Sequence, residues 1–256
     1  MSVHGSKTRV ATLVRAAALI ASTAVLSAQT AQLPAARDVI TRHIAALGGE
    51  AAFKAIHSIR VRGKFEITGA NINGDFEMVA ARPSKMKLSV TVPSFGPMER
   101  GYDGTVAWTI DSQLGPRLLK DRELRELAVD ADFDATLHPA ASIKEATTVA
   151  KTEYDGRPAY KLRVVFTSGV EQMEYFDADT GLQLGWEAER ALAPGMAVPT
   201  TGVSRDYQKF GNLMFATTMI EKALSTEQVL HINSIEYDVV PDSVFAIPPQ
   251  IKALIK

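Results

Sequence analysis

The chain has 256 residues, of which 46% are apolar and 22% charged, and these values exclude disordered, collagenous and coiled-coil proteins. The net charge is −1, and residues 29–256 alone carry about −4, a mild acidity that argues against a nucleic-acid partner. The chain contains no cysteine, which excludes a disulfide framework, a thiolate nucleophile and a cysteine-ligated metal.

Residues 1–28 have the pattern of a secretory signal peptide. Lys7 and Arg9 precede an apolar run of small residues at 16–28, and Ser27 and Ala28 are small residues before the expected cleavage. The run is shorter than the roughly 20 residues that a membrane-spanning helix needs. We therefore predict export to the bacterial periplasm, no integral membrane span in the mature form and, without a cysteine, no lipid attachment at the cleavage site.

After the signal peptide, the pattern predicts a short tether at 29–34, a single domain at 35–248 and a C-terminal tail at 249–256. Helical spacing occurs in two stretches, 35–56 and 119–138. In the first stretch, Val39, Ile40, Ile44 and Leu47 share one face, and a pair of glycines at 48–49 predicts a helix end.

Most of the remaining domain alternates between apolar and polar residues. From Ile59 to Ile67 every odd residue is apolar or small, and the residues between them are charged, as in a strand with one buried and one solvent-exposed face. The alternation recurs to the C-terminus, and turn pairs such as Asn73-Gly74 separate the segments. About ten such strands must bury one face, and two helical stretches are too few to cover a flat sheet.

We therefore predict a mainly β (α+β) fold. It would be a strongly curved antiparallel sheet that forms an incomplete barrel, with short helices covering its open side. A curled sheet closed by short helices leaves an apolar interior in which a ligand could bind.

Several segments, taken together behind a signal peptide, resemble a known family. They are AALGG at 45–49, IHSI at 56–59 with Gly63, GYDG at 101–104 with Trp108, DGRPAYKL at 155–162, YFDADTGL at 175–182, DY at 206–207 and VFAIP at 244–248. In this order they resemble outer membrane lipoprotein-sorting proteins of the LolA/LolB/LppX-like superfamily. The resemblance implies an incomplete barrel with helices in its mouth and a cavity that holds acyl chains of lipids or lipoproteins. A family arginine that latches the lid would correspond to Arg60, to Arg62 or to neither.

The sequence shows no arrangement of residues that is typical of catalysis or metal binding. The histidines are scattered, and none forms an H-x-x-x-H or H-E-x-x-H pair. Asp130, Asp132 and Asp134 resemble the start of a calcium loop, but Ala135 and Ala141 replace its glycine and its closing glutamate. We therefore predict no catalytic residues, no metal and no cofactor, and interpret the chain as a non-enzymatic protein.

The candidate ligand-binding residues are large apolar side chains in the alternating segments and in the second helical stretch. We expect those of the helical stretch to cover the open mouth of the sheet as a lid. Together, the cavity and lid candidates are Phe65, Phe76, Met78, Met86, Leu88, Trp108, Leu124, Leu127, Phe133, Leu137, Tyr160, Leu162, Tyr175 and Trp186.

The sequence thus predicts a periplasmic carrier or binding protein for an acyl chain, a lipid or a lipoprotein, with a possible protein partner in the envelope and a possible role in outer-membrane lipoprotein sorting. Two alternatives stay open. The same sheet could be fully packed and serve as an interaction module for another envelope protein, or the chain could be an enzyme whose site is dispersed along the sequence.

Overall fold

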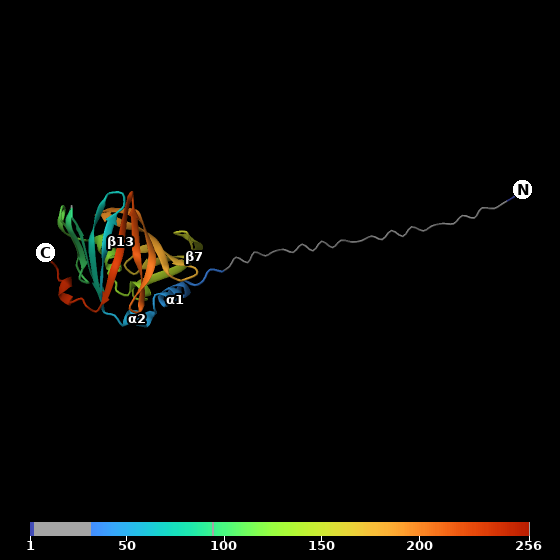
Figure 1. Ribbon diagram of the computed structural model, residues 1–256, viewed down its shortest axis with the longest axis horizontal. Helices are drawn as coiled ribbons and strands as arrows, with labels where there is room; N and C mark the ends of the chain where they lie inside the picture. Colours follow the sequence, from blue (N-terminus) through green and yellow to red (C-terminus); the bar gives the residue numbers. More distant parts are fainter. Residues whose placement is uncertain (3–31, 94, 256) are drawn as a thin grey trace. The chain divides into compact units, whose positions relative to one another are not determined.

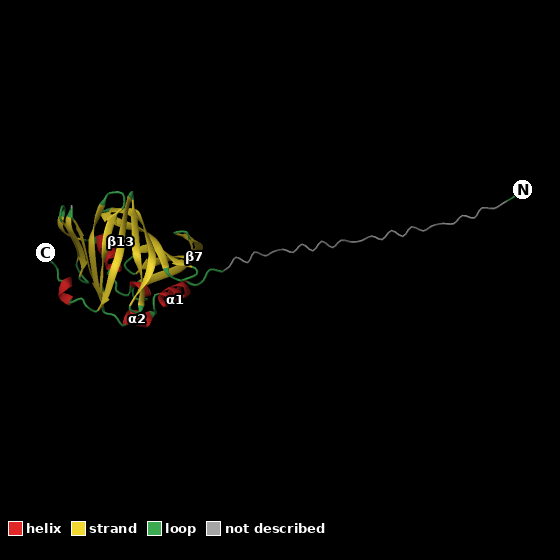
Figure 2. Ribbon diagram, viewed as in Figure 1, coloured by secondary structure: helices red, strands yellow, loops and turns green. Residues whose placement is uncertain are grey.

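The computed structural model describes residues 1–2, 32–93 and 95–255. The expected signal peptide and its cleavage site fall on residues 3–31, outside the described residues. Residues 33–256 belong to one unit built mainly of strands, drawn in Figures 1 and 2.

Within residues 32–93 and 95–255, thirteen strands form a single antiparallel sheet in the order β6-β5-β4-β3-β2-β1-β13-β12-β11-β10-β9-β8-β7. The sheet curls but does not close, because β6 and β7 end the order (Figure 1). The predicted fold class is therefore confirmed. The strands are β1 (Ser58–Ile67), β2 (Ile72–Ala81), β3 (Lys85–Val92), β4 (Gly96–Tyr102), β5 (Ala107–Asp111), β6 (Gly115–Leu118), β7 (Ile143–Tyr154), β8 (Arg157–Phe166), β9 (Glu171–Asp177), β10 (Gln183–Ala193), β11 (Met196–Phe210), β12 (Leu213–Ala223) and β13 (Thr226–Tyr237).

Short helices cover one end and the open side of the sheet. Helices α1 (Ala36–Ala46) and α2 (Glu50–Lys54) lie at one end (Figure 2). Gly48 and Gly49, both at positive φ, separate them, and a Cβ on Gly48 would collide with the carbonyl oxygen of Asn212. Only glycine therefore allows this close approach between the helical turn and the loop before β12.

The connection between the two edge strands crosses the concave side of the sheet. We call residues 119–142 the crossing segment. It contains α3 (Asp121–Asp130) and the 3₁₀ turn η1 (Ala135–Leu137). Leu127 packs with Ala107 and Leu119, whereas Phe133 and Leu137 join two other apolar clusters near the centre of the sheet. The crossing segment thus contacts the concave face at several points along its length.

The burial of the strands follows the alternation in the sequence. In β1, Ile59, Val61 and Phe65 are buried, while Arg62 and Lys64 between them are exposed. Leu162 and Val164 of β8 alternate in the same way and pack against α1. The side of these strands that carries the core therefore faces the helices.

The C-terminal residues pack back onto the sheet. The 3₁₀ turn η2 (Asp242–Phe245) follows β13, and α4 (Pro249–Lys252) contacts β6. Ile251 is fully buried, so part of the expected tail contributes to the folded unit.

Candidate functional site

The concave face of the sheet holds a cavity of about 420 Å³. This volume lies within the range of small-molecule sites, about 300–1,000 Å³. Most of the lining is apolar and comes from both halves of the sheet. The lining residues from the sheet are Ile59, Val61, Phe76, Met78, Met86, Leu88, Gln183, Ser204, Tyr207, Met214, Phe215, Ala216, Met219, Leu230, Ile232 and Ile235.

The two ends of the cavity differ in their access to solvent. His43, Leu47 and Phe53, on or next to α1 and α2, line it and are all buried, so the helices close this end. Met219 also lines the cavity but is 42% exposed, and Asp130 at the end of α3 is exposed as well. The cavity therefore opens to solvent beside Met219 and the end of α3.

Four of the predicted site residues line this cavity together: Phe76 and Met78 on β2, and Met86 and Leu88 on β3. Phe65 and Phe133 belong to the same apolar cluster as Phe76, but they are not among the lining residues. The four predicted residues that line the cavity therefore lie next to one another on the concave face of the sheet.

The other candidates lie in separate surroundings. Leu124 and Leu127 lie on α3 and pack with Ala107 and Leu119. Leu137 packs near Leu47 and Phe53, and Tyr160 and Leu162 pack against α1. Trp108 covers Gly101 and Trp186 covers Gly202. The structure does not bring these residues to the cavity wall.

Tyr175 belongs to a polar and aromatic cluster of its own. Its ring stacks on Tyr154 with 3.9 Å between centroids, and its hydroxyl donates to Glu187 at 2.6 Å. Burial raises the pKa of Tyr175, and the hydrogen bond to Glu187 adds to this shift. Because Glu174 precedes it on the strand and points to the crossing segment, Tyr175 faces away from that segment.

Sequence reasoning missed most of the cavity lining from β11 to β13 and from the first two helices. Leu230 and Ile232 alternate in the sequence, which was a usable signal. Tyr207 follows Asp206, whose φ is +57°, so the strand is locally irregular where Tyr207 reaches the cavity. Simple alternation gives no indication of such a position.

Arg82 ties the crossing segment to the closed end of the cavity. Its guanidinium pairs with Asp134, donates to the carbonyl oxygens of Ile56 at 2.8 Å and Phe53 at 3.0 Å, and lies 4.9 Å from the centre of the Phe133 ring. One arginine thus holds the loop after α3 against α2.

A second group of contacts holds α3 itself. Arg190 on β10 donates to Asp130 at 2.5 Å, and Glu126 accepts from Arg122 at 2.7 Å and from the backbone N–H of Ala191 at 2.9 Å. Burial lowers the pKa of Arg190, but the Asp130 carboxylate outweighs it, so the net shift is upward.

A buried ion pair fixes the end of the crossing segment. His138 Nε2 lies 2.7 Å from Glu174 Oε2, and both side chains are almost fully buried. Burial lowers the pKa of His138, but the carboxylate of Glu174 outweighs it and the net shift is upward. Burial raises the pKa of Glu174, but His138 and the amide of Gln172 outweigh it and the net shift is downward. Burial lowers the pKa of neighbouring His43 to about 4, so His43 is neutral at pH 7.

The two arginines considered for the lid latch lie elsewhere. Arg62 donates to Glu77 at 2.7 Å and to Glu236 at 3.0 Å, and Arg60 lies 3.6 Å from Glu77. Both alternate with Ile59 and Val61, so they face away from the cavity. Of the three possibilities that the sequence left open, the contacts favour neither Arg60 nor Arg62, because Arg82 and Arg190 contact the crossing segment instead.

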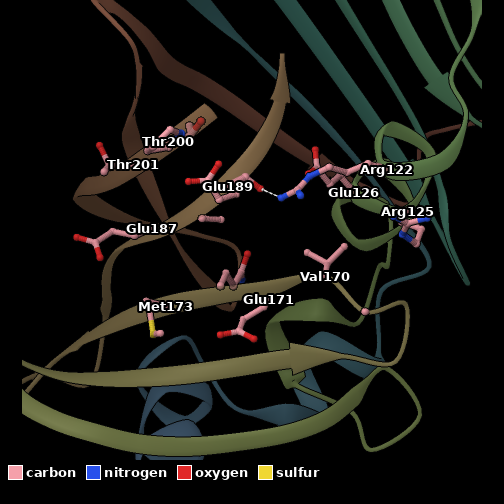
Figure 3. A pocket seen from close by; sticks show the side chains of 14 residues that line it. Arg122, Arg125, Glu126, Val170, Glu171, Met173, Glu187, Glu189, Thr200 and Thr201 are labelled. Carbon is pink, nitrogen blue, oxygen red and sulfur yellow. Dashed lines mark hydrogen bonds and ion pairs between the residues drawn. The ribbon is translucent and has the colours of Figure 1, made fainter. Parts of the chain in front are cut away.

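A second, more polar hollow of about 530 Å³ lies between α3 and strands β9, β10 and β11. Figure 3 shows Arg122 and Arg125 on one side of it and Glu171, Met173 and Glu187 on the other. A hollow lined by charged side chains of both signs does not suit an apolar ligand.

The described residues contain no group of three or more histidine, cysteine, aspartate and glutamate side chains placed to hold a metal. Among the same residues, no helix is both long and apolar enough to cross a membrane.

Comparisons with known proteins identify the fold. No family model and no curated protein sequence matches the chain. Among solved structures, a LolA superfamily protein from Nitrosomonas europaea aligns over 84% of this chain and 99% of its own, with a TM-score of 0.58 and 12% identity. A DUF1329 family protein from Desulfovibrio piger aligns over 82% and 97%, with a TM-score of 0.57 and 12% identity.

An outer membrane lipoprotein-sorting protein domain from Vibrio parahaemolyticus aligns over 80% of this chain and 97% of its own, with a TM-score of 0.50 and 11% identity. At these identities the likeness concerns the fold. The open thirteen-stranded sheet and its crossing segment are therefore a LolA-like fold.

Proposed function

We propose that this protein is a non-enzymatic carrier of the bacterial periplasm, which binds an acyl chain of a lipid or lipoprotein in the concave cavity. Export would follow from the signal peptide at 1–28. A role in outer-membrane lipoprotein sorting is the specific form of this proposal that the resemblance favours.

The observation that carries the proposal is the apolar cavity between the two halves of the sheet. Phe76, Met78 and Leu88 line one wall, and Phe215 and Ile232 line the other. Methionine side chains adapt their shape to different ligands, which suits a site for flexible chains. A fully packed module would leave no such space.

The crossing segment would act as the gate of this cavity. Arg82, Arg190 and Glu174 hold it to the sheet through side chains, and these contacts can break without unfolding a strand. A donor or acceptor protein in the envelope would supply the free energy that opens the gate, because a partner shifts the equilibrium only by binding the open form more tightly.

Native mass spectrometry of protein isolated from the periplasm tests the proposal. We expect an additional mass of an acyl-containing molecule that organic extraction removes and that thin-layer chromatography identifies as lipid. The bare protein mass, together with failure to bind an uncharged fluorescent probe such as N-phenyl-naphthylamine, would instead support the fully packed interaction module.

A further inference from the structure

A small polar pocket lies beneath α3, separate from the apolar cavity. Its volume is about 170 Å³, and Arg100, Thr109 and Arg117 from β4 to β6 line it together with Glu123 and Glu126 from α3. Arg100 also lies 3.9 Å from Asp130, which lines the apolar cavity. The two spaces are therefore neighbours on either side of the Arg100–Asp130 contact, beside the open end of the cavity.

The other charged groups of the polar pocket already have partners. Arg117 forms two hydrogen bonds with Glu123, at 2.7 and 2.9 Å. Glu126 accepts from Arg122 and from the backbone of Ala191. Their charges are therefore balanced within the protein.

Arg100 differs from these groups. Its guanidinium forms no hydrogen bond with any described residue, its Nε is buried without a partner, and its nearest carboxylate, Asp130, is itself bonded to Arg190. The Arg100 side chain is 39% exposed, so its guanidinium is open to a ligand that enters from solvent, and no hydrogen bond within the described residues competes with such a ligand. The planar guanidinium suits carboxylate and phosphate oxygens.

We propose that Arg100 binds the anionic head of an amphiphile whose acyl chain occupies the apolar cavity. This inference rests on the proposed function and adds the ligand class and its orientation. The tail would extend toward Leu47 and Phe53 at the closed end, and a carboxylate or phosphate would contact the Arg100 guanidinium at the edge of the polar pocket.

Several acids near this position oppose an anion. Asp130 lies 3.9 Å from Arg100 and is bonded to Arg190. Glu123 and Glu126 are paired with arginines, which leaves Glu221. Glu221 pairs with Gly202 in the sheet, and Gly202 pairs with Trp186, beneath Arg190. Burial raises the pKa of Glu221, which Asp130 reinforces and Arg190 and Arg100 oppose. Glu221→Gln should therefore strengthen the binding of an anionic amphiphile.

Displacement of N-phenyl-naphthylamine by three ligands with the same chain tests the proposal: hexadecanoate, hexadecanol and hexadecylamine. At about pH 8, where a carboxyl group is ionised, hexadecanoate should bind the wild type roughly tenfold more tightly than hexadecanol. Arg100→Gln should remove this preference and leave hexadecanol binding unchanged, and Arg100→Lys should restore part of it.

Arg60→Gln is the matched control, because Nε of Arg60 is also buried without a partner but the side chain faces away from the cavity. It should leave the preference unchanged. Equal binding of hexadecanoate and hexadecanol by the wild type, or an equal loss for all three ligands in Arg100→Gln, would overturn the assignment.

Three outcomes distinguish failure of this inference from failure of the proposed carrier function. If inorganic phosphate alone stabilises the wild type but not Arg100→Gln, the site binds free anions, and the assignment to an amphiphile is wrong. If neither the probe nor any of the three ligands binds, the proposed carrier function fails together with this inference. Binding of hexadecanol without any preference for hexadecanoate leaves the carrier function standing and overturns the inference alone.

Discussion

Nη2 of Arg190 on β10 lies 2.5 Å from Oδ2 of Asp130 at the end of α3, across the open side of the sheet. The pair joins the gate to one wall of the cavity, at the end where Met219 is exposed. Asp130 is exposed, although the Arg190 side chain is only 16% exposed, so solvent screens the pair in part and its contribution to the free energy of unfolding is modest.

Asp130→Asn should therefore affect ligand exchange more than stability. We expect the free energy of unfolding to fall by about 1 kcal/mol or less, and the dissociation rate of N-phenyl-naphthylamine, measured by stopped-flow fluorescence, to rise several-fold. Asp111→Asn, at the end of β5, is the control, because the Asp111 carboxylate accepts hydrogen bonds from the turn that follows it and not from α3. Unchanged dissociation in Asp130→Asn would show that α3 does not gate the cavity.

Arg82 should be more important for stability than any exposed arginine. Arg82→Met removes two hydrogen bonds to backbone carbonyls and the pair with Asp134, and we expect a loss of about 2–3 kcal/mol in urea unfolding. Arg62→Met removes only exposed pairs and should cost about 0.5 kcal/mol. Equal losses in both variants would contradict the role assigned to Arg82.

Glu174→Gln should reduce stability in a pH-dependent way. The pKa of His138 is raised in the folded protein, so its stabilising contribution is complete below 6.5 and is lost as the pH rises through the folded value. The pKa of Glu174 is lowered, so its contribution is complete above 4.5 and is lost as the pH falls through the folded value. The difference between wild type and Glu174→Gln should therefore be largest between pH 4.5 and 6.5 and shrink above it.

Urea titrations across this pH range measure the difference, which we expect to reach about 1–3 kcal/mol. Glu171→Gln, which removes an exposed partner of Arg163, serves as the control. His43 does not obscure the alkaline side: its pKa is lowered to about 4, so its contribution changes only as the pH falls below 6.5. A difference that stays constant from pH 5 to about 9 would contradict the buried ion pair.

The sequence predicts both Leu127 and Phe133 as lid residues, but their surroundings in the structure differ. We therefore expect different losses of stability when each is replaced by alanine. Leu127 is 0% exposed among Ala107, Leu119 and Leu124, so Leu127→Ala should cost about 2–5 kcal/mol, as in a packed core. Phe133 is partly buried, and Phe133→Ala should cost less and change probe release more. The opposite order, from the same urea and stopped-flow experiments, would contradict this division.

The fold could be predicted from the sequence because the alternation in strands such as β1 identifies one apolar face and one polar face. Ile59 to Ile67 alternate, and the turn residues between strands mark where the chain reverses. The gate contacts were not accessible in the same way. Arg82 and Asp134 are 52 residues apart, and His138 and Glu174 are 36 apart. Only the order of the strands brings these side chains together.

The cavity illustrates both cases. Met78, Met86 and Leu88 were found because they alternate along β2 and β3. Tyr175 also lies in an alternating segment, but its side chain faces the other side of β9. The sequence could not predict this, because β9 has apolar residues on both faces and the alternation does not show which face is concave. Residues from α1 and α2 reach the cavity only through the packing of the helices on the sheet.

The central claim is that an apolar chain occupies the cavity, and a cavity-filling variant tests it most directly. Ile232 lines the cavity from the same face of β13 as Leu230, so Ile232→Trp places a larger side chain in the ligand's space, whereas Val149→Trp places the same side chain at an exposed position of edge strand β7. Titration of both variants and the wild type with N-phenyl-naphthylamine should show saturable binding by the wild type and Val149→Trp and a loss of at least roughly tenfold in affinity for Ile232→Trp. Equal binding by all three folded proteins, or no binding by the wild type, would contradict the account.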